Sequence, residues 1–218
     1  MIDLHTHSIF SDGELIPSEL VRRAEFAGCR AIAITDHTDY SNYDLIVPRI
    51  LKVCEKINKV SSISAIPGVE LTHVNPVQIS ELVEEVRKMG ARIVVVHGET
   101  IVEPVIPGTN HAAIRACVDI LAHPGLISEE DARLAVENSV FLEVSARKGH
   151  SLTNGHVVQM ARQTGAKVVL NTDSHSPADL INKEFARMVG KGAGMSEGEI
   201  SKMFKNSDYL ARKASILR

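Results

Sequence analysis

Short apolar runs recur along the chain, and each is followed by a residue whose side chain can bind a metal ion. Random placement would scatter such side chains over helices and loops. The regularity therefore indicates strands whose ends build one common site. The runs are Met1 to Leu4 before His5 and His7, Ala31 to Thr35 before Asp36 and His37, Ile63 to Val69 before Glu70, Arg92 to Val96 before His97, Val118 to Ala122 before His123, Val140 to Leu142 before Glu143, and Lys167 to Thr172 before Asp173 and His175.

Segments with the periodicity of amphipathic helices separate these runs. One helix face is formed by an i, i+3, i+4, i+7 stripe, Ile79, Leu82, Val83 and Val86. The strand that follows it, Arg92 to Val96, is nearly all β-branched, which is typical of a strand buried on both faces. The expected helices run from Pro17 to Ala27, from Tyr43 to Asn58, from Asn75-Pro76 to a stop before Gly90, from His111 to Cys117, from the cap Ser128 onward, from Asn154 to Thr164, from Ser176 to a stop at Gly190, from Ser196 to Phe204 and from Ser207 to Leu217.

This alternation of strands and helices predicts an α/β fold with parallel β/α units. Seven units favour a closed or nearly closed barrel, in which the carboxyl ends of all strands meet at one mouth. An open sheet would concentrate functional residues at a single crossover point instead. No linker, repeat or low-complexity segment interrupts the pattern. We therefore expect a single domain over residues 1–218, with extra C-terminal helices at about 196–218.

Composition narrows the functional classes. The formal charge of −3 gives no basic footprint for nucleic acid, which is not expected as a partner. No apolar stretch reaches the ~18 residues of a membrane span, and the N-terminus lacks the features of a signal peptide. Cys29, Cys54 and Cys117 are widely spaced and suit buried, reduced thiols. We expect a cytoplasmic protein without a membrane partner, and the oligomeric state stays open.

The candidate ligands are too numerous for one metal ion. His5 and His7 stand two residues apart, so on a strand their side chains face the same side and can bind one ion. The alternative is that they are two surface histidines near a terminus without a common ligand. One ion takes about four to six ligands, whereas two or three divalent ions bridged by Glu70 would satisfy the whole set. A shell of imidazoles and carboxylates without thiolate suits zinc, manganese or iron. Such ions activate water for hydrolysis, best suited to phosphate esters. The set comprises His5, His7, His37, His97, His123, His175, Asp12, Glu70 and Asp173.

The motifs resemble those of the polymerase and histidinol phosphatase (PHP) superfamily, in the same order. They are His5-Thr6-His7, Thr35-Asp36-His37, Gly68-Val69-Glu70, Val96-His97-Gly98, Ala122-His123-Pro124-Gly125 and Asn171-Thr172-Asp173-Ser174-His175. The resemblance implies a distorted (β/α)7 TIM-like barrel with a trinuclear metal site at the C-terminal ends of the strands. It also implies that the nine residues named above are the ligands, although some members of the family have histidine near the place of Asp12. Asp36 resembles a residue that orients a ligand for catalysis.

The loop after the sixth strand is basic and belongs to the same mouth. Arg147 and Lys148 could hold a substrate phosphate there, with a merely solvated loop as the alternative. Glu99 could orient His97, which stands two residues before it. His150, His156, His73 and His111 are interpreted as local loop or helix residues, and Cys117 and Met160 as core residues.

The resemblance implies a hydrolase acting on phosphoric ester bonds. We expect a metal-bound hydroxide to hydrolyse a small phosphate ester, as in histidinol-phosphate phosphatases. One alternative is a 3′–5′ exonuclease or an oligonucleotide or nucleotide phosphodiesterase, since related domains accompany DNA polymerases. The chain offers few aromatic residues for stacking bases, which favours a small phosphorylated substrate. A non-catalytic metal-binding regulatory domain is another alternative, and an amidohydrolase a further one that usually adds a bridging lysine, which no strand end supplies here.

Overall fold

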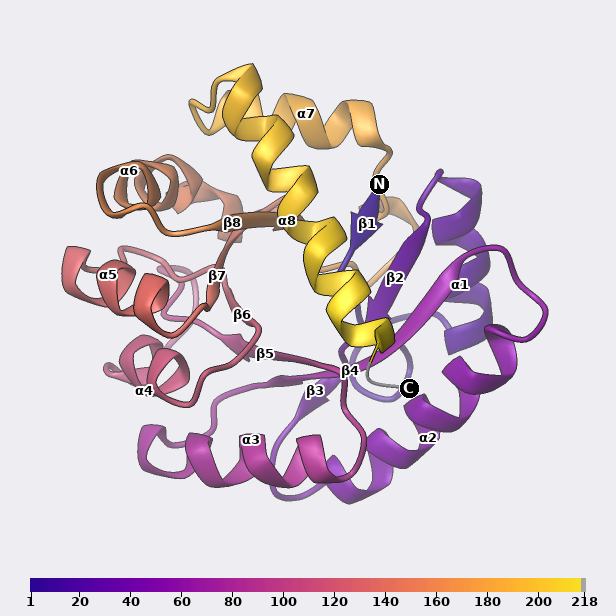
Figure 1. The fold of residues 1–218 in the computed structure, drawn as a ribbon. Coiled ribbons are helices and arrows are strands. Elements are labelled where there is room, and N and C mark those ends of the chain that lie inside the picture. Colours follow the sequence, from indigo (N-terminus) through magenta and orange to yellow (C-terminus); the bar gives the residue numbers. More distant parts are fainter. Residues whose placement is uncertain (217–218) are drawn as a thin grey trace.

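Seven parallel strands form the centre of the protein, as the alternation predicts. A computed structural model describes residues 1–216 (Figure 1). Neighbouring strands follow the order β1-β2-β4-β5-β6-β7-β8, and the two-residue strand β3 (His37–Thr38) pairs with β4. The strands are β1 (Ile2–Asp3), β2 (Ala31–Ile34), β4 (Ser64–Leu71), β5 (Ile93–His97), β6 (Ile120–Ala122), β7 (Phe141–Ser145) and β8 (Val168–Asn171).

The ring between β1 and β8 is closed beyond the ends of these two strands. Thr6 and Ser174 form an isolated parallel bridge. The backbone N–H of Asp173 donates to the carbonyl of His5 at 3.0 Å, and that of His7 donates to the carbonyl of Ser174 at 2.8 Å. The (β/α)7 TIM-like barrel is therefore confirmed. Its closure places the first and last candidate ligands of the chain side by side.

Helices surround the ring of strands, and the last helix crosses one of its ends (Figure 1). None of the helices within residues 1–216 has both the length and the apolar character that crossing a membrane requires. The helices are α1 (Pro17–Phe26), α2 (Tyr43–Ile57), α3 (Ile79–Lys88), α4 (Thr109–Arg115), α5 (Glu129–Glu137), α6 (Asn154–Thr164), α7 (Lys183–Gly192) and α8 (Glu197–Ile216), with short 3-10 helices at Pro76–Gln78, His150–Thr153 and Pro177–Asp179.

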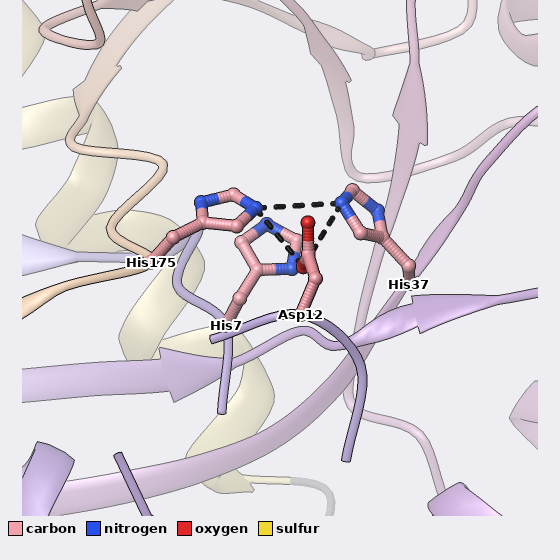
Figure 2. A group of neighbouring side chains, drawn as sticks. All are labelled: His7, Asp12, His37 and His175. Carbon is pink, nitrogen blue, oxygen red and sulfur yellow. Dashed lines mark hydrogen bonds and ion pairs between the residues drawn. The ribbon is translucent and has the colours of Figure 1, made fainter. Parts of the chain in front are cut away.

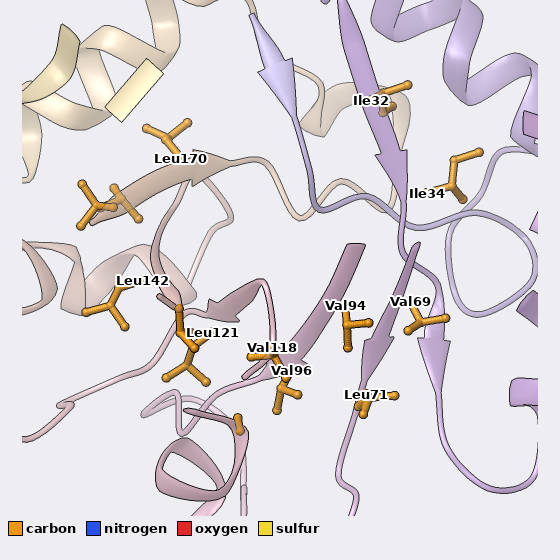
Figure 3. Close-up of a cluster of buried hydrophobic side chains, with 14 of the residues drawn as sticks. Ile32, Ile34, Val69, Leu71, Val94, Val96, Val118, Leu121, Leu142 and Leu170 are labelled. Carbon is orange, nitrogen blue, oxygen red and sulfur yellow. The ribbon is translucent and has the colours of Figure 1, made fainter. Parts of the chain in front are cut away.

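Alternate residues of each strand enter two separate hydrophobic clusters. Ile32 and Ile34 belong to the larger cluster, which also contains residues of the surrounding helices (Figure 3). Ala31 and Ala33 belong to the smaller cluster, which fills the inside of the barrel. This period of two is what a strand buried on both faces requires, because successive side chains point to opposite sides.

Helix α8 closes the barrel at the end opposite the ligand-bearing loops. Leu210, Ala211 and Ala214 join the interior cluster and are almost fully buried, with Leu210 only 1% exposed. The helix also contacts β1, β4 and β8. Its apolar face therefore seals the barrel interior below the candidate site.

Two helix expectations near the C-terminus were wrong. The segments 196–204 and 207–217 form one continuous helix up to Ile216, while Leu217 lies outside the described residues. Asn206 lies between the two expected segments, and its side chain donates to the carbonyl of Val168 at 2.8 Å, which ties this part of α8 to β8. The expected helix from Ser176 to Gly190 is instead a 3-10 turn followed by α7, which starts anew where the side chain of Asn182 accepts a hydrogen bond from the N–H of Phe185.

The assignment of Cys117 to the core was also wrong. Cys29 and Cys54 are buried, whereas Cys117 is exposed. It occupies the turn between α4 and β6 with a φ of 54°, and this left-handed backbone directs the side chain toward solvent. Met160 does pack against the larger cluster while partly buried.

If α8 seals the barrel, truncating a buried side chain that joins the interior cluster must open a cavity. We expect Leu210→Ala to lower the free energy of unfolding by about 2–5 kcal/mol, the usual range for a buried leucine. The matched control is Leu126→Ala at a side chain that is 66% exposed, for which we expect a change within about 0.5 kcal/mol. Urea denaturation followed by circular dichroism measures both values. Equal losses in the two variants would contradict the sealing role of α8.

Candidate metal centre

The nine residues indicated by the sequence gather at the carboxyl ends of the strands. Six of the seven strands of the ring therefore deliver part of one cluster, as a barrel topology allows, and β7 delivers none of these nine residues. His5 and His7 follow β1 and Asp12 lies in the next loop, His37 follows β2, Glu70 lies near the end of β4, His97 ends β5, His123 follows β6, and Asp173 and His175 follow β8.

Glu70 is the central carboxylate of this cluster and is fully buried. Its Oε1 lies 3.2 Å from Nε2 of His5 and 3.6 Å from Nε2 of His123. Its Oε2 lies 2.7 Å from Nδ1 of His37 and 3.6 Å from Nε2 of His7. The two oxygens thus face different pairs of imidazoles, which is the arrangement needed to bridge two ions.

Asp173 is a second buried carboxylate beside the same histidines. Its Oδ1 lies 3.1 Å from Nε2 of His7 and 3.6 Å from Nε2 of His5. Asp173 and His123 have φ angles of 52° and 26°, in the left-handed region that side chains rarely adopt. Such a conformation costs on the order of 1–3 kcal/mol per residue and is typical of functional sites.

A third group of side chains lies at the more exposed edge of the cluster (Figure 2). Oδ1 of Asp12 is 3.1 Å from Nε2 of His175 and 3.5 Å from Nε2 of His37. His7 offers a ligand atom within 4.8 Å of those of the other three. The imidazole–carboxylate set of His7, Asp12, His37 and His175 could hold one divalent ion.

The geometry of the cluster fits metal ions better than internal hydrogen bonds. Several buried polar atoms have no hydrogen-bond partner within the described residues, among them Nε2 of His5 and His7, Oε1 of Glu70 and Oδ1 of Asp173. Buried polar atoms are normally paired. Ligand atoms bound at about 2.1 Å to one tetrahedral ion lie roughly 3.4 Å apart. The spacings around Glu70 and Asp173 bracket that value, so the residues present fit a group of divalent ions.

The charges of the cluster also favour cations. Burial opposes ionisation of Glu70, yet the neighbouring His5 and His37 hold its pKa well below the usual range. Burial likewise opposes ionisation of Asp173, but His5 and His7 lower its pKa. Burial lowers the pKa of His7 to about 3, so its ring stays neutral. The ionised carboxylates and the neutral ring of His7 are in the protonation states that bind metal. Burial lowers the pKa of His5 and of His37, but the neighbouring carboxylates raise both pKa values above the usual range, so these two rings would release a proton when a metal binds.

Glu143 orients one of the candidate ligands from behind. It is fully buried within β7, and its Oε2 lies 2.9 Å from Nδ1 of His5. Burial lowers the pKa of His5, but the charges of Glu70, Glu143 and Asp173 outweigh burial and raise it well above its usual value. A carboxylate on Nδ1 fixes the ring and leaves Nε2 for a metal. The sequence places Glu143 directly after an expected strand, but it does not indicate that this carboxylate orients His5.

Asp36 organises the loop that leads to Asp12. Its buried carboxylate accepts hydrogen bonds from the backbone N–H and the hydroxyl of Ser8, both at 2.7 Å, and from the hydroxyl of Ser11 at 2.9 Å. Burial raises its pKa, and the same hydrogen bonds oppose that rise. Asp36 therefore acts through the backbone that carries its neighbours, and not through a hydrogen bond to a histidine ring.

Two residues that the sequence did not indicate as ligands join the cluster. His150 is 5% exposed, and its ring stacks on that of His123 with centroids 4.0 Å apart. Burial lowers its pKa to about 4. Oε2 of Glu103 lies 3.1 Å from Nε2 of His97. The one sequence signal for His150 is its position five residues after Ser145, which ends β7.

The two basic residues of the loop after β7 lie in different surroundings: Arg147 is at the site and Lys148 is in solvent. Nη1 of Arg147 donates to the carbonyl of Asp173 at 3.0 Å, and its Nε lies 3.5 Å from Oδ2 of the same residue. Lys148 is exposed and forms no ion pair with another described residue. The structure thus places Arg147 beside the carboxylates and leaves Lys148 apart from them.

The other histidines considered in the sequence analysis contact residues close to them in the fold. Nε2 of His156 lies 2.8 Å from the carbonyl of Ile127, and Nδ1 of His111 lies 2.8 Å from Asp131. Neither pair involves a candidate ligand, in agreement with the local interpretation of both histidines. His73 stands at the edge of the mouth, where its ring lies 5.3 Å from that of His97.

Comparison with known proteins establishes the family. Residues 3–99 match the model of the PHP domain. The chain is 52% identical to an uncharacterized protein of Methanocaldococcus jannaschii over 200 residues, covering 91% of this chain and 92% of the relative. It is 28% identical to a probable phosphatase of Thermoanaerobacter sp. strain X514, covering 98% and 95% of the two chains. The protein belongs to the PHP family.

The fold recurs in solved structures of other proteins. A chain in a cryo-EM structure of archaeal ribonuclease P with mature tRNA matches with a TM-score of 0.76, and the match covers 100% of this chain and 92% of that one. The two sequences are 18% identical. This likeness concerns the barrel alone, because one fold can carry many different functions.

If Glu143 orients His5 for a metal, removing its charge must weaken binding. We expect Glu143→Gln, which keeps the size of the side chain, to lower the affinity for a divalent ion by about 10–100-fold. Competition with a chromogenic chelator measures this affinity, and Glu137→Gln at an exposed position is the control. An unchanged affinity in a folded Glu143→Gln protein would contradict the orienting role.

Proposed function

We propose that this protein is a metal-dependent phosphoesterase that hydrolyses a small phosphate ester. The observation that carries the proposal is the pair of buried carboxylates, Glu70 and Asp173, enclosed by imidazoles with Arg147 beside them. Divalent ions at carboxylate–imidazole sites promote phosphate ester hydrolysis, and guanidinium is the side chain that best matches a phosphate. The similarity to a probable phosphatase supports the same activity.

The candidate ligands divide naturally into groups around Glu70. His5, His7 and Asp173 would hold one ion with Glu70, while Asp12, His37 and His175 would hold another at the exposed edge. His97 and His123, whose rings lie 4.4 Å apart, would hold a further ion, and Nε2 of His123 is 3.6 Å from Oε1 of Glu70. When bound, such ions would lower the pKa of water to about 7 and polarise the phosphoryl oxygens. Two or three zinc, manganese or iron ions would satisfy the whole set.

Arg147 would bind the phosphoryl group from the side of β7. Its contacts with Asp173 use only some of its five N–H donors, and its side chain is 29% exposed at the mouth. The remaining donors can reach a phosphate that lies above the carboxylates. A guanidinium held in place before the reaction stabilises the charge that develops on the phosphoryl oxygens. Arg147 therefore both orients the ester and stabilises its transition state.

A small, intracellular phosphomonoester of the histidinol-phosphate type is the substrate class we favour. The chain carries no net positive charge and few aromatic residues, so it is poorly suited to a long polyanion. The three free cysteines suit a reducing compartment such as the cytoplasm. The alternative substrate classes are phosphodiesters and oligonucleotides, and comparing their hydrolysis with that of phosphomonoesters decides between them.

Arg147 provides the sharpest mutational test of substrate binding. We expect Arg147→Ala to lower kcat/KM for the best phosphomonoester by roughly 10²-fold, the scale for losing one charge-stabilising donor. Metal content should not change, because guanidinium has no lone pair for a metal. The neighbouring variant Lys148→Ala is the matched control and should keep nearly full activity. Full activity of Arg147→Ala would show that this part of the loop is only solvated.

The substrate class follows from one comparative screen. The protein loaded with Mn²⁺ or Zn²⁺ is assayed against phosphomonoesters, dinucleotides and single-stranded oligonucleotides. We expect hydrolysis of phosphomonoesters that disappears together with metal in His97→Ala and Asp173→Ala. Hydrolysis of oligonucleotides alone would make the protein a nuclease. No hydrolysis of any ester by the metal-loaded protein would contradict the phosphoesterase proposal.

A further inference from the structure

Three imidazoles meet on the side of the mouth formed by β5, β6 and β7. His97, His123 and His150 can each offer a ring nitrogen within 4.8 Å of those of the other two. All three side chains are nearly inaccessible, with exposed fractions of 3%, 2% and 5%. Three neighbouring strands thus bring their histidines to one point, although the sequence indicated only two of them as ligands.

The outer nitrogens of His150 and His97 both lie within hydrogen-bond distance of an oxygen that can accept a hydrogen bond. Nδ1 of His150 lies 2.9 Å from the hydroxyl of Thr100, and Nδ1 of His97 lies 3.2 Å from the carbonyl of Gly98. A proton on Nδ1 that is engaged by an oxygen leaves the lone pair on Nε2, which is the form of imidazole that binds a metal. His150 therefore has the arrangement of a ligand as well as its position.

A carboxylate covers this group of rings from the solvent side. Oε2 of Glu103 lies 3.1 Å from Nε2 of His97, and its Oε1 lies 3.3 Å from Nε2 of His150. The side chain of Glu103 is 38% exposed, in contrast to the buried rings beneath it. The carboxylate thus spans two of the three inward-facing nitrogens and closes the group toward solvent.

The loop that carries Glu103 is anchored at its base. The carboxylate of Glu99 accepts hydrogen bonds from the backbone N–H groups of Gly108, at 3.0 Å, and Asn110, at 2.9 Å. Gly125 has a φ of 61°, and a Cβ there would stand 1.8 Å from the carbonyl oxygen of Glu99. Only glycine lets the loop pack this closely. The base of the loop that carries Glu103 is therefore fixed by the fold.

We propose that His150 and Glu103, together with His97 and His123, are the ligands of one divalent ion. Three imidazoles and one carboxylate form a complete set for a tetrahedral ion such as Zn²⁺. This position would then have its own protein ligands and would depend less on sharing Glu70. The proposal rests on the metal dependence proposed above and extends the ligand set to two residues outside the nine that the sequence indicates.

The test counts metal ions in matched variants. His150→Gln and Glu103→Gln are compared with the native protein and with His111→Gln and Glu130→Gln, which change exposed side chains elsewhere. Each protein is saturated with Zn²⁺, dialysed against a zinc buffer and analysed by inductively coupled plasma mass spectrometry. We expect each of the first two variants to contain one ion fewer per chain, or to bind it at least about 10–100-fold more weakly, while the controls match the native protein.

Two further measurements separate a lost ligand from a lost fold. Circular dichroism checks that the variants are folded, and Glu103→Gln alters only an exposed loop. Thr100→Val leaves both proposed ligands in place but removes the partner of Nδ1, so we expect it also to weaken the binding of one ion. In the Co²⁺-loaded protein, loss of a ligand must change the visible absorption spectrum.

The outcomes distinguish this inference from the proposed function. A native protein that binds two or more ions, together with folded His150→Gln and Glu103→Gln variants of the same stoichiometry and affinity, would overturn the assignment of these two ligands alone. A native protein that takes up no divalent ion would overturn both this assignment and the metal-dependent activity.

Discussion

The burial of the Glu70 carboxylate is the constraint on which the rest of this structure depends. A buried carboxylate is costly unless positive charge or hydrogen-bond donors surround it. Here the surroundings are imidazoles from β1, β2 and β6, and no lysine or arginine forms an ion pair with it among the described residues. Imidazoles are weak and titratable counter-charges, so divalent ions between Glu70 and these rings are the arrangement that removes the cost most completely.

The barrel supplies the rigidity that this arrangement needs. Closure through the Thr6–Ser174 bridge fixes the two ends of the chain's ligand set against each other. At the opposite end, the apolar face of α8 packs into the barrel interior and closes it beneath the site. The packed barrel also holds the backbone of His123 and Asp173 in the left-handed region, which is unfavourable for both residues. The stability of the fold is in this way coupled to the geometry of the cluster.

Much of this site could be predicted because apolar runs followed by histidine, aspartate or glutamate recur along the sequence. Parallel strands must bring their carboxyl ends together, so His5, Glu70 and Asp173 could be assigned to one mouth from pattern alone. Glu103 could not be assigned in this way, because it stands in an exposed loop without hydrophobic periodicity. No sequence pattern near it indicates where its side chain points. The orientation of His150 depends on Thr100, fifty residues away.

The central claim is that several divalent ions share the Glu70 carboxylate. A crystal structure of the metal-loaded protein, with anomalous scattering recorded at the absorption edge of the metal, tests this claim most directly. The account predicts two or three anomalous peaks at the barrel mouth, with neighbouring ions about 3.5–4 Å apart and Glu70 in contact with at least two of them. A single peak, or peaks that do not include Glu70 among their ligands, would contradict it.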